Sequence, residues 1–166
     1  MEKHENEIPV NYWEYPFTGF SFMVKLVKSL DANNPTDFED HECNFQEVSG
    51  LNITLDTEEV NEGGENMFAH RIPSRPKFQN LVLKRGMLNY ADSGLIKWAQ
   101  DSISKFSFTP KMLNVILMDE KKNPLASWVV IGAYPVGIKV SDFKSMEDSI
   151  VVETLELAFD YLKRIN

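Results

Sequence analysis

Apolar and polar side chains alternate along several stretches of this chain, and this two-residue period limits the fold more than any other feature. The first run places Phe20, Phe22, Val24 and Leu26 on one face. Successive side chains of a strand point to opposite faces, so the alternation predicts β-strands. We expect strands at 17–27, 45–51, 53–60, 78–86, 113–118, 128–140 and 149–162, the last followed by a C-terminal tail.

One segment has a helical period instead. It begins after Asp92 or Ser93, either of which can cap a helix, and Pro110 prevents its continuation. Its apolar residues recur every three or four positions: Leu95, Trp98, Ala99, Ile103 and Phe106. The fold class is therefore mainly β, with two packed sheets forming a barrel or sandwich and one α-helix covering an end.

At 166 residues the chain is long enough for one domain with a full core. We expect an N-terminal arm at 1–16, a single β domain at 17–162 and a short tail at 163–166. Aromatic and aliphatic residues at the alternating and helical positions should form the core, and we assign to it Phe20, Phe22, Trp98, Trp128 and Leu155.

The connections between the expected strands are polar. Residues 31–42 contain turn formers and acids without an apolar period, which indicates a loop. The segment 62–66, with Gly63 and Gly64, is too polar to be packed and should be a surface loop that extends through Pro73 and Pro76. Residues 119–124 supply a reversal between two strands of a hairpin.

The charge and the reactive residues exclude several classes of protein. Lys and Arg number 17 against 25 Asp and Glu, a net charge of −8, which argues against coating DNA. The one cysteine, Cys43, excludes an intrachain disulfide, and the histidines are scattered at His4, His41 and His70. The first residues are charged and no run approaches about 18 apolar residues, so we expect neither a secretory signal nor a membrane span.

None of the short motifs supports catalysis. Ser49 precedes a glycine but lacks the Gly-x-Ser-x-Gly elbow and a positioned histidine. Adjacent acids at 58–59 point to opposite faces of a strand, and those at 119–120 lie at a hairpin tip. The glycine pair at 63–64 lacks the spacing of a phosphate-binding loop. We therefore predict that the chain is not an enzyme and needs no cofactor or metal.

Two alternatives remain open from the residues alone. A β-barrel could enclose a small apolar ligand among its aromatics, namely Phe20, Phe22, Trp98 and Trp128, although such spacings are more typical of a core. A hydrolase using the adjacent acids is the remoter alternative.

A set of short motifs occurs in a familiar order. The motifs are FQEVSGL at 45–51, EGGEN at 62–66, NLVLKRG at 80–86, Trp98, MDEKKNP at 118–124, Trp128, the Tyr-Pro pair at 134–135 and ETLELA at 153–158. In this order the chain resembles the tail tube proteins of contractile bacteriophages and of phage-tail-like contractile injection systems. The resemblance covers roughly residues 17 to 160.

The resemblance implies a structural role. It implies a subunit that forms hexameric rings, which stack into a hollow tube inside a contractile sheath, with baseplate and tube-terminator or cap proteins as further partners. Synthesis in the bacterial cytoplasm without a signal peptide is implied, as is assembly into a virion tail or injection particle. Cargo or DNA would pass only in transit, without stable membrane insertion. The longer segment 31–42 and the N-terminal arm leave open an initiator ring at the baseplate instead of the bulk tube.

Two groups of residues are candidates for roles in such a tube. Contacts with other copies are expected from the strand and loop motifs, at Glu47, Ser49, Gly50, Glu62, Gly63, Gly64, Glu65, Asn66 and Arg85. Polar strand faces, which a monomer would merely solvate, are candidates to line the lumen, at Thr54, Asp56, Glu58, Thr154 and Glu156. An acidic lumen would repel nucleic acid and acidic cargo.

Overall fold

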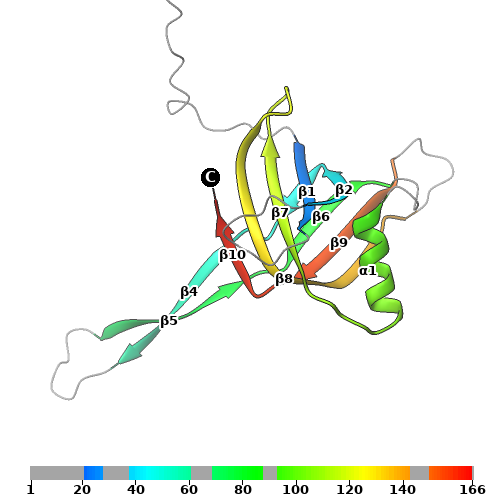
Figure 1. The fold of residues 1–166 in the computed structure, drawn as a ribbon. Helices are drawn as coiled ribbons and strands as arrows, with labels where there is room; N and C mark the ends of the chain where they lie inside the picture. The colour runs from blue at the N-terminus through cyan, green and yellow to red at the C-terminus, as the bar shows by residue number, and fades with distance from the viewer. Residues whose placement is uncertain (1–20, 28–37, 61–68, 88–92, 143–149, 166) are drawn as a thin grey trace, which may run out of the picture.

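The computed structural model describes residues 21–27, 38–60, 69–87, 93–142 and 150–165. Within them the chain forms ten strands and one helix (Figure 1). The elements are β1 (Ser21–Val27), β2 (Phe38–Phe45), β3 (Glu47–Ser49), β4 (Ile53–Val60), β5 (His70–Phe78), β6 (Leu81–Gly86), α1 (Gly94–Ser104), β7 (Lys111–Met118), β8 (Pro124–Val140), β9 (Val152–Ala158) and β10 (Tyr161–Arg164). The mainly β fold with one helix is confirmed.

The body of the molecule is one antiparallel path of strands folded into two layers. Its order is β2-β1-β7-β8-β9-β6-β3, with β10 also paired to β8. The 17-residue strand β8 belongs to both layers, because it pairs with β7 up to Ala133 and with β9 from Tyr134 onward. Gly132, with φ +71°, lies at this change of partner. The result is a sandwich, as predicted, rather than a closed barrel.

The core lies between the two layers. Strands β6 and β9 alternate strictly between buried and partly buried side chains, and their inward residues include Leu83 and Leu155. Three other expected core residues, Phe22, Trp98 and Trp128, are partly buried and pack against this cluster. The remaining one, Phe20, lies outside the described residues.

A buried ion pair between β6 and β9 connects these two strands to the start of the helix. The Arg85 Nε and Nη2 atoms lie 3.2 and 3.1 Å from Glu153 Oε2, and the guanidinium also contacts the ring of Phe45. Arg85 donates a further hydrogen bond to the hydroxyl of Ser93, which precedes α1. Ser93 therefore binds this arginine instead of capping the helix with its side chain. Because Arg85 is 3% exposed, it is not at the surface of the subunit, where we had expected it to contact a neighbour.

Strand boundaries differ from the prediction where pairing overrides local sequence. β2 begins at Phe38, inside the segment 31–42 that we expected to be a loop, because its backbone pairs with β1. The expected strand 45–51 is broken at Gln46, which separates β2 from the three-residue β3. At the C-terminal end, β9 is followed by a second short strand, β10, which pairs with β8 and includes Lys163 and Arg164.

The prediction that the loop extends through Pro73 and Pro76 was wrong. Both prolines lie within β5, which pairs with β4 to form a separate two-stranded sheet. Proline removes a backbone donor but is tolerated where one edge of a strand has no partner strand. Figure 1 shows this β4–β5 ribbon projecting from the body on the side away from α1.

The buried apolar face of the helix ends earlier along the chain than its sequence suggested. Its buried residues are Leu95, Ile96, Ala99 and Ser102, whereas Ile103 is 38% exposed. Phe106 lies beyond the helix end and does not pack on the core. The period continues past the last turn that contacts the sandwich, so the apolar spacing overestimates the buried face.

The predicted β7–β8 reversal is confirmed. β7 ends at Met118 and β8 begins at Pro124. Asn123 donates hydrogen bonds from its side chain and its backbone to the Asp119 carboxylate. These bonds favour the ionised form and hold the pKa of Asp119 below its ordinary value. The acids at 119–120 are thus part of a solvated turn.

Candidate subunit-contact surfaces

Near its base the β4–β5 ribbon presents two chemically different faces. Residues directly opposite on paired strands share a face, and the pairs Ile53–Phe78 and Leu55–Pro76 place apolar groups together near its base. Pro73, opposite Thr57, continues this face. Farther out this division is lost, because the Glu59–Arg71 pair lies on this same face and exposed Ile72 and Val60 lie on the other. Ile53 and Leu55 are 58% and 55% exposed, so the ribbon presents aliphatic side chains to solvent.

The apolar side chains of the ribbon continue onto the body. Phe78 is partly buried, and its ring lies 5.5 Å from that of Phe159 and 6.1 Å from that of Tyr161 on β10. Tyr161 is itself about half exposed. We call the exposed set Ile53, Leu55, Pro73, Pro76 and Tyr161 the ribbon patch.

The opposite face of the ribbon carries three of the lumen candidates. Thr54, Asp56 and Glu58 share it, because β4 has no extra residue and the bulge between the two strands falls on β5. Asp56 forms an ion pair with Lys77, and Glu58 accepts a hydrogen bond from the hydroxyl of Ser74. All three candidates are exposed.

The other two lumen candidates lie on the body. Thr154 and Glu156 are on the outward face of β9, whose inward positions fill the core. Glu156 accepts a hydrogen bond from the Asn80 amide at 2.9 Å and pairs with Lys139 at 3.6 Å. On the same outward face Glu47 lies 2.8 Å from Lys84. Acids here are balanced by lysines, so this surface is less acidic than the net charge of the chain suggests.

The contact candidates around β3 differ in exposure. Glu47 and Ser49 are exposed at an edge strand of the body. Gly50 is buried with φ +90°, and a Cβ at this position would overlap the carbonyl oxygen of Asn80. Gly50 therefore serves close backbone packing within the subunit. The loop candidates Glu62, Gly63, Gly64, Glu65 and Asn66 lie outside the described residues.

An apolar groove runs between α1 and the second half of β8. Its volume is about 550 Å³, and Glu153 is the one charged residue in its lining. The lining is otherwise apolar or neutral, with exposed Met87, Ile103, Val136 and Val140. We call this feature the helix groove.

An exposed aromatic group continues the apolar surface beyond the end of the helix. The Phe106 ring lies 5.4 Å from that of Phe108, which lies 6.3 Å from that of Tyr134. Phe106 is 86% exposed and has φ +48°, in the left-handed region. Ser107 and Phe106 donate backbone hydrogen bonds to Ser102 and Ile103, the pattern that usually has glycine at this position.

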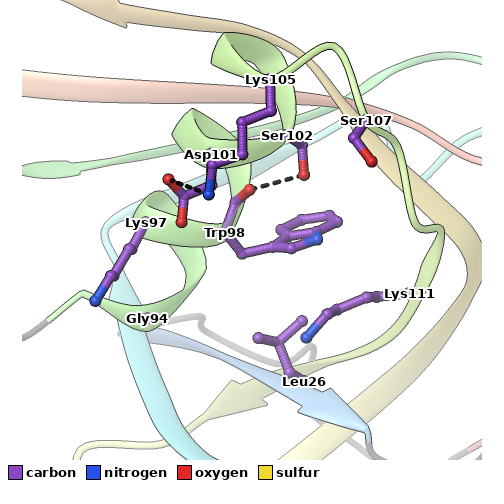
Figure 2. Close-up of a pocket in the computed structure, with 9 residues that line it drawn as sticks. All are labelled: Leu26, Gly94, Lys97, Trp98, Asp101, Ser102, Lys105, Ser107 and Lys111. Carbon is purple, nitrogen blue, oxygen red and sulfur yellow. Dashed lines mark hydrogen bonds and ion pairs between the residues drawn. The ribbon is translucent and has the colours of Figure 1, made fainter.

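A second pocket lies on the other side of the helix (Figure 2). It has a volume of about 380 Å³, and three lysines line it: Lys97, Lys105 and Lys111. The Lys111 ammonium lies 6.0 Å from the centre of the Trp98 ring, and Lys105 pairs with Asp101 at 3.5 Å. Phe22 and Trp128 do not line this pocket or the helix groove, and with Trp98 they pack against the core, so neither space is the aromatic-lined ligand cavity considered above.

Sites for other chemistry are not seen in the part of the chain that the structure describes. There, no three His, Cys, Asp or Glu side chains gather to hold a metal ion. No helix among the described residues is long and apolar enough to cross a membrane.

Sequence reasoning missed the helix groove and the ribbon patch. The alternation of Ile53 and Leu55 predicted a strand, but alternation does not show that the strand leaves its apolar side chains exposed. The groove combines residues from α1, β8 and the segment after β6, and no local spacing indicates that they meet.

This fold occurs in many solved structures, among them the following three. A chain in the sixfold-symmetrised baseplate of the anti-feeding prophage is 25% identical, with a TM-score of 0.76 over 92% of this chain and 97% of that chain. A chain of the PVC sheath–tube complex, an extracellular contractile injection system in the extended state, is 24% identical, with a TM-score of 0.72 over 91% and 92%. Hcp1 from Salmonella typhimurium is 13% identical, with a TM-score of 0.52 over 89% and 86%.

This chain thus shares its fold with chains found in the baseplate of the anti-feeding prophage and in the PVC sheath–tube complex. The family model of the T4-like virus tail tube protein gp19 matches residues 18–163, and the chain belongs to this family. The family is one of structural proteins of the tail tube. No curated protein sequence matches the chain.

Proposed function

We propose that this chain is a structural subunit of the inner tube of a contractile tail or injection system. It assembles into hexameric rings, and the rings stack into a hollow conduit surrounded by a contractile sheath. One observation supports this most directly. This chain, which belongs to the tail tube family, has a projecting two-stranded ribbon, and the aliphatic side chains of that ribbon are exposed in the isolated subunit.

The free edges of the body supply the second kind of contact that a ring needs. Among the described residues, β2 and β3 stand at the two ends of the strand path, and β10 pairs only with β8. Such edges present backbone donors and acceptors that another copy can pair with. A head-to-tail contact of this kind closes into a ring when its rotation permits, whereas a contact along the axis propagates a filament.

The polar outward face of β9 and β6 is suited to a channel wall. Its lysines and acids are paired, as in Lys84 with Glu47 and Lys139 with Glu156, so a passing cargo of either sign meets few uncompensated charges. We therefore retain Thr154 and Glu156 as the lumen candidates on the body. The ribbon candidates Thr54, Asp56 and Glu58 line the lumen only if the ribbon turns its polar face inward.

An initiator ring at the baseplate is the second candidate, because one similar chain comes from a baseplate structure. The two roles share the ring but differ in stacking. A bulk tube subunit forms long rods with its sheath, whereas an initiator forms single rings that join only a baseplate.

Negative-stain microscopy of the purified chain, alone and co-expressed with sheath and baseplate proteins from its source, tests the proposal. We expect sixfold rings and hollow rods. A chain that stays monomeric at high concentration, and that is absent from sheathed particles after co-expression, overturns it. Rings that never stack, but that co-purify with the baseplate, favour the initiator.

A further inference from the structure

We propose that the ribbon patch of one copy docks into the helix groove of a neighbouring copy. This inference rests on the proposed assembly and names the two surfaces that meet in it. Both surfaces are apolar and both are exposed in the subunit. The β4–β5 ribbon and α1, which contribute to them, lie on opposite sides of the body (Figure 1).

The ribbon is a ridge with a suitable chemical surface. An isolated two-stranded hairpin is marginally stable in water, so its order requires further contacts. Its two ion pairs, Asp56–Lys77 and Glu59–Arg71, are solvent-exposed and contribute little. Burying Ile53 and Leu55 in a neighbour removes aliphatic surface from water and supplies the missing stabilisation.

The groove is a matching depression. Its one charged lining residue, Glu153, is already paired with buried Arg85, so an entering apolar side chain does not strand a charge. Exposed Val136 and Val140 on β8 and Ile103 on α1 offer aliphatic contacts along its length. A groove of about 550 Å³ is in the size range of protein pockets that enclose apolar groups.

Phe106 gives a second reason to place an interface at this end of the helix. Phe106 has a bulky side chain in the left-handed region, a backbone conformation that such residues rarely adopt. In the subunit this conformation leaves the ring 86% exposed, and Ile103, to which the Phe106 backbone amide bonds, lines the groove. This backbone conformation closes the helix with two hydrogen bonds, but it leaves the Phe106 ring without burial in the subunit, so the ring is available to contact another molecule.

The arrangement also fits head-to-tail assembly. In a twofold-symmetric dimer, both subunits use the same surface patch. Because the ribbon and α1 lie on opposite sides of the body (Figure 1), such a dimer cannot bury both the ribbon patch and the helix groove. Each copy instead donates a ribbon to one neighbour and accepts a ribbon from another. Every groove in the interior of an assembly is then filled.

Cross-linking between differently labelled copies tests this pairing. Cys43→Ser removes the native thiol, and Leu55→Cys is placed in one copy while Val136→Cys is placed in another. The assembled mixture is treated with a short bis-maleimide. The matched control replaces Val136→Cys with Lys122→Cys, which is exposed in the β7–β8 turn.

We expect a cross-linked heterodimer as the main product of the Leu55–Val136 mixture and its loss in the control. Rings or rods that form normally but give no more heterodimer than the control overturn the docking while leaving the proposed function intact. A chain that never assembles overturns both.

Charge exchange provides a test that does not depend on cross-linking geometry. Leu55→Lys and Val136→Glu should each cause loss of assembly while the isolated subunit remains folded. The double variant Leu55→Lys/Val136→Glu should recover assembly, because the two new charges attract. Failure of that rescue, or normal assembly of either single variant, contradicts the pairing.

Discussion

The sandwich body and the β4–β5 ribbon use the same antiparallel pairing but differ in what stabilises them. In the body, inward residues such as Leu83 and Leu155 are fully removed from water. In the ribbon, every residue of β4 is exposed, and the strands contact each other more than they contact the body. The comparison shows that secondary structure alone does not say whether a region is stable by itself, because burial supplies most of the free energy.

The buried ion pair offers the largest expected difference between the regions. Arg85→Ala leaves Glu153 buried without its partner, and we expect the free energy of unfolding to fall by about 3–5 kcal/mol. Arg71→Ala, which removes the exposed partner of Glu59 in the ribbon, should cost no more than about 1 kcal/mol. Urea unfolding of the isolated subunit measures both values. Equal losses would show that burial does not separate these pairs.

A pair of leucines allows the regions to be compared with the same substitution. Leu83→Ala creates a cavity in the core and should destabilise the subunit by about 2–5 kcal/mol. Leu55→Ala removes an exposed side chain and should change the free energy of unfolding by less than about 0.5 kcal/mol.

Assembly should respond in the opposite sense to stability. Leu55→Ala is expected to weaken ring or rod formation, as measured by sedimentation of the assembled material, although the subunit remains folded. If Leu55→Ala melts the subunit as strongly as Leu83→Ala does, the ribbon is part of the cooperative unit and the comparison fails.

Substitutions of two glycines within the body should have smaller effects on stability. Gly50→Ala places a Cβ against the Asn80 carbonyl in a backbone conformation that disfavours side chains, and should cost about 1–3 kcal/mol. At Gly137 the nearest atom to an added Cβ is Glu156 Oε2 at 3.8 Å, so Gly137→Ala should change stability by less than about 0.5 kcal/mol. Thermal unfolding separates the two. A stable Gly50→Ala variant would return Gly50 to the surface candidates.

The spacing of apolar residues along the sequence predicted several of the strands and the helix. Alternation located β1, β4, β6 and β7, and the helical period located α1, because their side chains face the core or solvent in the expected order. The polar start of β2 and the prolines of β5 were missed because pairing with a neighbouring strand, rather than side-chain character, makes these segments extended.

The candidate site was predictable to a smaller extent. The two-residue period of a strand predicted that Thr54, Asp56 and Glu58 share one face, and in the structure they lie on one face of the ribbon. Arg85 was misplaced at the surface because its partner Glu153 is 68 residues away and only the fold brings the two together. The helix groove depends in the same way on the distance between elements, which spacing along the chain does not contain.

The single strand β8 that serves both layers has a mechanical consequence. Its backbone is continuous from the pairing with β7 to the pairing with β9, so tension applied to one layer reaches the other through covalent bonds as well as through packed side chains. Sliding of one layer over the other would require β8 to break its hydrogen bonds with at least one neighbouring strand. A wall built from such subunits is therefore stiff against shear between its inner and outer surfaces.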